Sequence, residues 1–172
     1  LEGEDLSAED LYEGLKRGTF NMDFVPVLYG SALKNIGIQP LMDRIVQCFP
    51  SPTEMGEHKG TNPVTKEEEV RRADEEEPFS AFVFKTIADP FTGKLTLFRI
   101  YSGVLNSEST MYNSSKQVKE RVGQIFQMEG KGQKSLTEAG AGELVAVAKL
   151  KETTTGDSLC DENAPIVFEA FT

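Results

Sequence analysis

The sequence predicts a mainly β protein, in which a small, closed, Greek-key-like β-barrel follows a partial α/β segment. From Phe79 onward, short runs rich in Phe, Val, Ile and Thr are separated by turn residues about every eight to twelve positions, the rhythm of small β-domains. Before Pro50, apolar residues recur instead at helical spacing. These patterns predict three segments, namely 1–49, a linker at 50–78, and the barrel at 79–172.

The first segment begins with the signals of a helix. Ser7 and Asp10 have the spacing of a capping box, with Asp in place of the usual Glu. Leu11 and Leu15 then lie four residues apart on one helical face. Gly18 is expected to end this helix.

A strand and a second helix are predicted next. The apolar run Val25–Tyr29 is typical of a strand buried on both faces. Apolar residues between Pro40 and Phe49 recur at helical spacing, with the proline in the first turn. Because one such strand cannot bury its own faces, we expect the segment to be the end of an α/β domain whose other strands are missing.

Residues 50–78 are predicted to form an exposed linker that is mobile in part. Prolines, glycines and charge runs dominate, and periodic apolar residues are almost absent. His58, the single histidine of the chain, lies here and is expected to be solvated, because a catalytic histidine needs a fixed partner. The acidic run at 67–69 is expected to be solvated rather than metal-binding.

The barrel segment is predicted to contain about seven strands and no helix. Closure into a barrel would hide the strand edges that otherwise favour aggregation. The predicted strands are Phe79–Ile87, Leu95–Leu105, Ser109–Tyr112, Lys119–Met128, Leu144–Leu150, Ser158–Cys160 and Ile166–Glu169.

The second of these strands changes its apolar parity. Leu95 and Leu97 occupy odd positions, whereas the next apolar residues, from Phe98, occupy even positions. A β-bulge near Phe98 would bring both sets to one core face and turn Arg99 and Tyr101 outward. The alternative is a strand that is buried on both faces.

Charge and composition limit the class of protein. The net charge is −10; residues 1–78 hold 8 basic and 17 acidic residues and residues 79–172 hold 10 and 11, which gives −9 and −1. The nearly neutral second half can therefore still present basic clusters to phosphates. No apolar run reaches the ~20 residues of a membrane span, and no secretory signal is present, so we expect a cytoplasmic protein with no membrane partner. Cys48 and Cys160 are expected to be reduced structural thiols.

The loop GSALKNIG, which follows the predicted strand, is a candidate binding site. Ligands of α/β domains lie beyond the carboxyl ends of strands, and Gly30 is at such an end. Ser31 could hydrogen-bond its own loop and leave the N–H groups of Ala32 and Leu33 to face an acceptor such as a purine oxygen. Taken alone, the loop fits a plain strand-to-helix connection better.

The run VPVLYGSALKNIGIQPLMDRIVQCFPSPTE resembles the end of the GTP-binding domain of the elongation factor G family, with its G-S-A-x-K-N-x-G-x-Q-x-L-x-D motif and Pro-Ser-Pro linker. FSAFVFKTIADPFTGKLTLFRIYSGVL, YNSSKQVKERVGQIFQM and AGAGELVAVAKLKETTTGDSLCD are similar to its second domain in order and spacing. The resemblance implies a fragment of a translational GTPase that promotes ribosomal translocation. An elongation-factor paralogue, a ribosome-protection factor and a release-type factor are the alternatives within this class.

The resemblance also implies a guanine-binding loop made of Gly30, Ser31, Ala32, Leu33 and Lys34. The chain contains no G-x-x-x-x-G-K-[ST], D-x-x-G or N-K-x-D sequence. We therefore expect no catalytic residues, no bound metal and no cofactor in this chain, and GTP and Mg²⁺ in the parent protein. The chain alone is not expected to be an enzyme.

Barrels of this family imply docking on the ribosome, so basic and hydroxyl residues of the barrel are candidate contacts to small-subunit rRNA. They are Arg99, Tyr101, Ser114, Ser115, Lys116, Lys119 and Arg121. A hydroxyl-rich turn is the candidate contact to the remaining domains of the parent factor, with ordinary hairpin chemistry as its alternative. It comprises Thr153, Thr154, Thr155, Gly156 and Asp157.

Two other classes of protein fit less well. An oligonucleotide- or sugar-binding barrel without a GTPase would need exposed aromatic residues interleaved with basic ones, whereas most phenylalanines here alternate like core residues. A hydrolase would need two carboxylates held close together, and the acidic residues lie mostly in the linker and the first segment.

Overall fold

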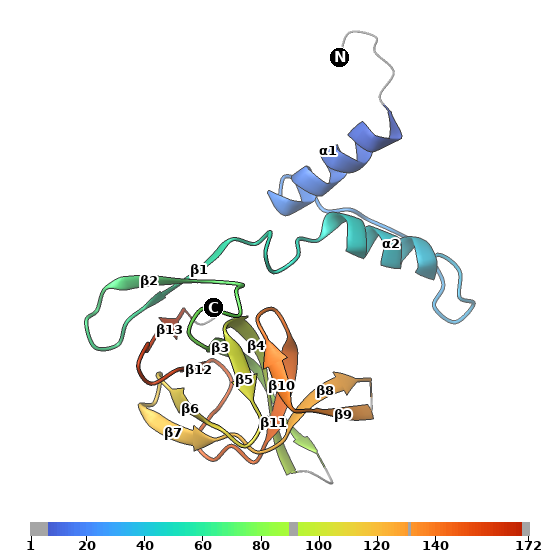
Figure 1. Ribbon diagram of the computed structural model, residues 1–172. Coiled ribbons are helices and arrows are strands. Elements are labelled where there is room, and N and C mark those ends of the chain that lie inside the picture. Colours follow the sequence, from blue (N-terminus) through green and yellow to red (C-terminus); the bar gives the residue numbers. More distant parts are fainter. Residues whose placement is uncertain (1–6, 90–92, 131, 170–172) are drawn as a thin grey trace. The chain divides into compact units, whose positions relative to one another are not determined.

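A computed structural model describes residues 7–89, 93–130 and 132–169 (Figure 1). The chain divides into two compact units, Leu1–Ser51 and Pro52–Thr172. Within the described residues, no helix is long and apolar enough to span a membrane. Cys48 and Cys160 are buried free thiols, as predicted.

The first unit contains two helices, α1 (Ala8–Phe20) and α2 (Ile38–Cys48). The predicted capping box is confirmed, because the Asp10 N–H donates to Ser7 Oγ at 3.1 Å and the Ser7 N–H donates to Asp10 Oδ2 at 3.1 Å. The Arg44 guanidinium lies 4.8 Å from the centre of the Tyr12 ring and so links the two helices.

Gly18 lies inside α1 and does not end it, so that prediction is wrong. The helix continues to Phe20, and the Asn21 N–H caps it by donating to the Arg17 carbonyl at 2.9 Å. A Cβ at position 18 would lie only 2.1 Å from Cε1 of Phe24. Glycine is therefore present here because the Phe24 ring packs directly on the helix backbone.

Val25–Tyr29 does not form the predicted buried strand. These residues belong to no strand of the structure, and the side chains of Val27 and Tyr29 are 89% and 98% exposed. A strand buried on both faces needs neighbouring strands, and no strand of the described residues lies in this unit. The run is apolar, but this unit does not provide the layers that would cover it.

The predicted linker contains a β-hairpin, so that segment is not simply an exposed, mobile connection. β1 (Glu57–Thr61) pairs with β2 (Glu68–Arg72) on one side and with β13 (Val167–Phe168) on the other. The turn is held by Asn62, whose Oδ1 accepts the N–H of Val64 at 2.9 Å. Arg71 is buried and donates to Glu69 and to the Ala164 carbonyl. Polar contacts hold this sheet, and an apolar pattern therefore did not reveal it.

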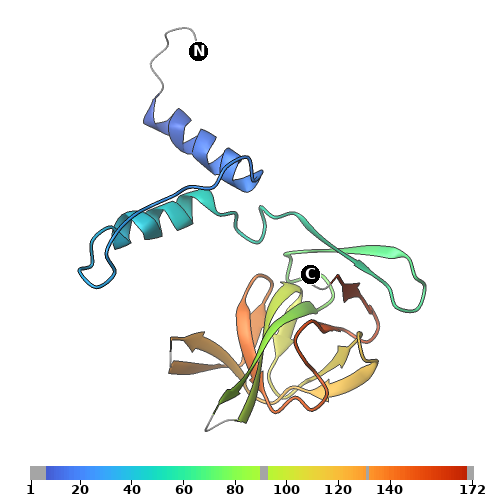
Figure 2. The same ribbon diagram turned by 180° about the vertical axis from the view of Figure 1, so that it is seen from behind.

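The second unit is built on an antiparallel sheet of eight strands in the order β7-β6-β12-β3-β4-β11-β8-β9, with β5 and β10 as a separate pair. Figures 1 and 2 show from opposite sides that this sheet curls back on itself. The strands are β3 (Ser80–Asp89), β4 (Gly93–Ser102), β5 (Val104–Asn106), β6 (Thr110–Asn113), β7 (Val118–Arg121), β8 (Ile125–Glu129), β9 (Gly132–Leu136), β10 (Glu138–Gly140), β11 (Leu144–Ala148) and β12 (Ser158–Cys160).

The predicted mainly β, barrel-like fold is confirmed. Its main core collects buried side chains from strands on all sides of the curled sheet, including Val83, Phe98, Met111 and Val147. The strand order ends at β7 and β9, and no ladder of described residues joins these two strands. The eight strands therefore form a sheet that curls around one core, without a ladder of described residues between its two end strands.

Strand boundaries differ from the prediction in several places. The predicted strand Leu95–Leu105 is two strands, β4 and β5, which belong to different sheets. The predicted strand Lys119–Met128 is two strands, because Val122 turns into the core with 0% exposure and Gly123 follows it between β7 and β8. β9 and β10 were not predicted, since β9 is mostly polar and exposed and β10 is only three residues long. Polar edge strands give no apolar alternation to detect.

β4 is buried on both faces, so the single-face interpretation with a bulge in β4 at Phe98 is wrong. Phe98 belongs to the main core, whereas Leu95 belongs to a second cluster with Phe126 and Ala146 on the other side of the sheet. The irregularity near Phe98 lies in the partner strand, where Phe84 is the extra residue between two paired positions of β3. The change in apolar parity along β4 therefore reflects the burial of both faces of this strand.

Candidate nucleic-acid interface

The Gly30–Gly37 loop is a tight turn closed by its own backbone. The Ser31 N–H donates to the Ile36 carbonyl at 2.9 Å, and the Ile36 N–H donates back to Ser31 at 3.0 Å. A Cβ at Gly30 would lie 2.5 Å from the Ile36 carbonyl oxygen, which explains the need for glycine. Gly37 has φ +79° and begins α2 as its N-cap.

Two N–H groups of this loop take no part in its internal backbone hydrogen bonds. Lys34 and Asn35 donate to the carbonyls of Ser31 and Ala32 at 3.2 and 3.1 Å. By contrast, no backbone hydrogen bond from the N–H of Ala32 or Leu33 occurs within the described part of the chain. Both residues are exposed. The loop therefore presents two adjacent donors at its tip.

The Lys116 ammonium binds the hydroxyl-rich loop at 153–157. This contact was not predicted. Its Nζ donates to the Glu152 carbonyl at 2.5 Å and to Thr154 Oγ1 at 2.7 Å, and lies 3.1 Å from Asp157 Oδ2. An ammonium with these three oxygen partners has little capacity left for a phosphate. Two predicted sites, the Lys116 turn and the loop at 153–157, are thus one structure.

Glu120 organises that loop from beneath, and sequence reasoning missed it. Its carboxylate is 4% exposed and accepts the N–H groups of Lys151, Glu152 and Thr153 at 3.1, 2.8 and 2.9 Å, together with the Thr153 hydroxyl at 3.0 Å. Burial by itself raises the pKa of Glu120, but these four donors outweigh it, so the pKa lies below its ordinary value. The carboxylate therefore stays charged and fixes the loop backbone.

Asn113 completes the buried network. Its Nδ2 donates to Thr153 Oγ1 at 3.1 Å and to Asp157 Oδ2 at 2.9 Å, while the Thr154 N–H donates to the same Asp157 oxygen at 2.8 Å. Thr153 and Asp157 are buried, whereas Thr154 and Thr155 are exposed. Only the exposed residues of the predicted interface loop can meet a partner directly.

Ser114 is buried, so the prediction that it contacts RNA is wrong. Its hydroxyl is taken up by the carbonyls of Ile166 and Ser158 at 2.5 and 3.2 Å. Ser115 is exposed, but its Oγ accepts the Ser158 N–H at 2.9 Å. These hydroxyls fasten the β6–β7 turn to β12.

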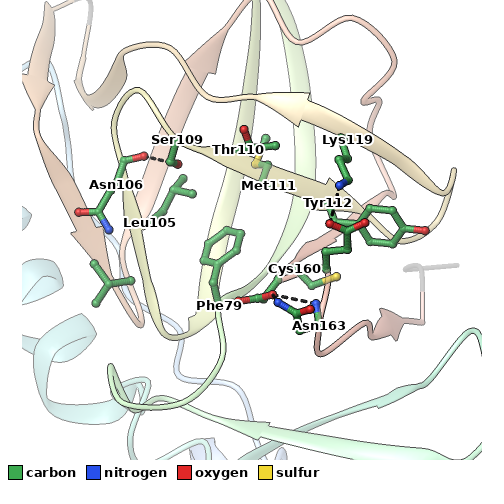
Figure 3. A pocket seen from close by; sticks show the side chains of 13 residues that line it. Phe79, Leu105, Asn106, Ser109, Thr110, Met111, Tyr112, Lys119, Cys160 and Asn163 are labelled. Carbon is green, nitrogen blue, oxygen red and sulfur yellow. Dashed lines mark hydrogen bonds and ion pairs between the residues drawn. The ribbon is translucent and has the colours of Figure 1, made fainter.

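Lys119 and Arg121 are exposed but paired. Lys119 Nζ lies 2.6 Å from Glu162 Oε2, and Arg121 donates to Glu108 at 3.1 Å. Both pairs are more than half exposed, so they are weak and can exchange partners. Lys119 and Glu162 line a cavity of about 500 Å³ together with Phe79, and Figure 3 shows Lys119 and Phe79 among the side chains around it.

Arg99 and Tyr101 lie on the face of β4 away from the main core, as predicted, but Tyr101 is covered. Its ring stacks on His58 at 3.9 Å between centroids and meets Phe168 edge-on at 4.8 Å. His58 therefore has a fixed partner, and the prediction of a solvated linker histidine is wrong. Burial and then the charge of Arg99 lower the His58 pKa, and burial raises the pKa of Tyr101.

The unpaired cations of the barrel are mostly residues that the sequence did not single out. Six lysine and arginine residues among the described residues from 79 onward form no ion pair with a described carboxylate. They are Lys85, Lys94, Arg99, Lys134, Lys149 and Lys151. The described residues contain no cluster of three or more His, Cys, Asp or Glu suited to a metal ion.

The residues that form most of this barrel match a known protein family. The family model of elongation factor G domain 2 matches residues 78–162. Residues 78–162 belong to the elongation factor G domain 2 family. This domain 2 contains every predicted rRNA-contact residue, the Glu120 network and the loop at 153–157. The second unit is thus built around a domain of a translation elongation factor.

A solved structure extends the comparison beyond domain 2. A crystal structure of a protein from Thermus thermophilus is similar to this chain with a TM-score of 0.66 and 26% sequence identity. The match covers 95% of this chain and 23% of that chain. The chain therefore spans less than a quarter of the length of that protein. Its similarity includes residues on both sides of domain 2.

Proposed function

We propose that this chain is part of a translational GTPase of the elongation factor G type, which promotes ribosomal translocation. The membership of residues 78–162 in the domain 2 family carries the proposal. The barrel would dock on small-subunit rRNA, and the exposed Thr154 and Thr155 would contact the remaining domains of the parent. GTP and Mg²⁺ would be bound by the parent protein.

The cations of the barrel that form no ion pair with a described carboxylate support the RNA partner. Domain 2 lies within a half of the chain whose net charge is only −1. Six of its cations are not neutralised by a described carboxylate. Phosphate contacts provide most of the affinity of such surfaces, and released counterions make that affinity depend on salt.

Cosedimentation with small ribosomal subunits tests the docking. We expect the full 172-residue chain to pellet with the subunits at about 50 mM salt. Three phosphate contacts predict that its affinity for the subunits falls by a factor of the order of tens between about 50 and about 200 mM salt. Large subunits serve as the control. Binding that ignores salt, or that is equal on both subunits, contradicts the proposal.

The Gly30–Gly37 loop is proposed to retain guanine recognition through the N–H groups of Ala32 and Leu33. One or two backbone donors support only about millimolar affinity for GDP. We expect GDP, but not ADP, to shift the amide resonances of these residues in NMR titrations. Ala32→Pro removes one of the two donors and should weaken the shift of the Leu33 amide, whereas Leu33→Ala keeps both N–H groups and should retain the shifts. Micromolar affinity, or equal shifts with ADP, would contradict this assignment.

A further inference from the structure

Two cavities of the second unit meet at Tyr112 and Glu162, which line both of them. The larger, of about 500 Å³, has apolar side chains of the main core in its wall, Phe79 and Leu105 among them (Figure 3). The smaller, of about 200 Å³, lies between the β1–β2 turn and the segment before β13. The two cavities are here named together the Tyr112 groove. Its lining includes Phe79, Leu105, Thr110, Tyr112, Glu162 and Pro165.

One edge of β6 is open beside the larger cavity. β6 pairs with β7 along its whole length, but with β12 only through its last two residues, because β12 ends at Cys160. On the β7 side, the Val122 N–H donates to the Ser109 carbonyl at 2.9 Å. Hydrogen-bonding groups alternate between the two sides of a strand, so the N–H and C=O of the next residue, Thr110, face the side where β12 has ended. Among the described residues, no backbone hydrogen bond joins Thr110 to a partner on that side.

The groove is acidic. Asp161 lines the larger cavity and Glu162 lines both, while Lys119 is the one cation among the described residues around them. Lys119 Nζ lies 2.6 Å from Glu162 Oε2, in a pair whose side chains are 60% and 54% exposed. Because exposed pairs of this kind are weak, a cation brought by a ligand can take the place of Lys119 at little cost. The net charge of −10 on the chain also attracts a basic ligand.

We propose that the Tyr112 groove binds an extended, basic peptide segment of a partner protein. The segment pairs with Thr110 as a short added strand, in the place that β12 leaves open. Side chains two residues apart in a strand point to the same face and lie about 7 Å from each other, so they can enter two adjoining cavities. An apolar side chain enters the larger cavity against Phe79 and Leu105, and a lysine or arginine reaches Glu162.

This inference goes beyond the proposed docking on RNA, because it assigns a protein partner to a different surface. None of the six unpaired cations named above lines the groove, and phosphates would be repelled by Asp161 and Glu162. The open N–H and C=O of Thr110 favour a peptide over a small molecule, since a peptide main chain carries both matching groups at the spacing of a strand.

NMR titration of the full chain with a capped synthetic peptide tests the groove. The probe is Thr-Val-Thr-Leu-Thr-Arg-Thr, in which the apolar and the basic side chain are two residues apart. We expect it to shift the amide resonances of Thr110 and Glu162 with a dissociation constant of about 1 mM, the strength that one pair of backbone hydrogen bonds and two side chains support. A matched peptide with glutamate in place of arginine should bind at least about tenfold more weakly.

Two variants of the chain separate the backbone contact from the charge contact. Thr110→Pro removes the open N–H at a position where no ladder hydrogen bond is lost, and should weaken binding of the probe about tenfold. Glu162→Gln should bring the two peptides to within about threefold of each other. Glu108→Gln is its matched control, because it removes the same charge from an exposed pair outside the groove, and should change binding by less than about twofold.

Several results would overturn the groove as a peptide site. They are equal affinity for the two peptides, unchanged binding by Thr110→Pro, equal effects of Glu162→Gln and Glu108→Gln, and the absence of any shift at about 5 mM peptide. Shifts of the same amides by an RNA duplex would assign the groove to nucleic acid instead. If the amide spectrum shows that Thr110→Pro is unfolded, the exposed Glu162 variant still decides the outcome. Cosedimentation with small subunits tests the proposed function separately.

Discussion

Replacing Glu120 by alanine is expected to lower the free energy of unfolding by about 3 kcal/mol, because three backbone N–H groups and the Thr153 hydroxyl lose their buried acceptor. Chemical denaturation of the full chain measures the change. Glu162→Ala is the matched control, since it removes the same charge from a pair that is 54% exposed on the Glu162 side. The control should cost less than about 1 kcal/mol. Similar losses in the two variants would mean that the Glu120 network does not stabilise the loop.

The same carboxylate gives the protein a defined response to acid. The pKa of Glu120 is lowered from its ordinary 4.5 in the folded chain, so its stabilisation is present above pH 4.5 and is lost as the pH falls through the folded pKa. Glu120→Gln cannot titrate and should show a flatter fall of the unfolding midpoint below pH 4.5 than the natural chain. A parallel fall in both proteins would contradict the lowered pKa.

Replacing Phe98 by alanine is expected to be the most destabilising single truncation of the core, at about 4 kcal/mol. The ring is fully buried and lies between Val83 of β3 and Val145 of β11, with which it is paired in register. In a chain of this size the loss corresponds to a fall in melting temperature of about 8 to 16 °C, measurable by calorimetry.

Phe84 provides the matched control on the neighbouring strand. It is the extra residue of the β3 irregularity and is 39% exposed, so Phe84→Ala removes the same atoms from a partly solvated position. We expect a loss below about 1.5 kcal/mol. If the two substitutions had equal effects, the main core would not be centred on β4.

The elements with strong local signals could be predicted from the sequence. The Ser7–Asp10 capping box, α2 and the central strands of the barrel follow from side-chain spacing alone, because these features depend on residues close in the chain. The β1–β2 hairpin could not be predicted in this way. Its stability comes from Asn62, Arg71 and pairing with β13, about a hundred residues away.

The candidate contacts show a second limit of local reasoning. Lys116, Lys119 and Arg121 are clustered in the sequence, and the cluster suggested phosphate binding. The fold brings a carboxylate from another segment to each of them: Asp157 to Lys116, Glu162 to Lys119 and Glu108 to Arg121. Whether a cation is free to bind a phosphate depends on the side chains that lie near it in the fold, and the composition of a segment does not show which these are. Lys149 and Lys151 illustrate the converse, since nothing in their local sequence distinguished them.

The pairing of β1 with β13 has a consequence for the growing chain. Thr61 finds its partner Val167 only after the intervening barrel strands have been made. At about 5–20 residues per second, that delay on the ribosome is of the order of 5–20 s. During this delay, the edge of β1 that later pairs with β13 has unpaired N–H and C=O groups, which can pair with any extended peptide. The first strand of this sheet, β1, is therefore the last to gain its full set of partners. A chaperone that covered its open edge would be most useful just before synthesis reaches residue 167.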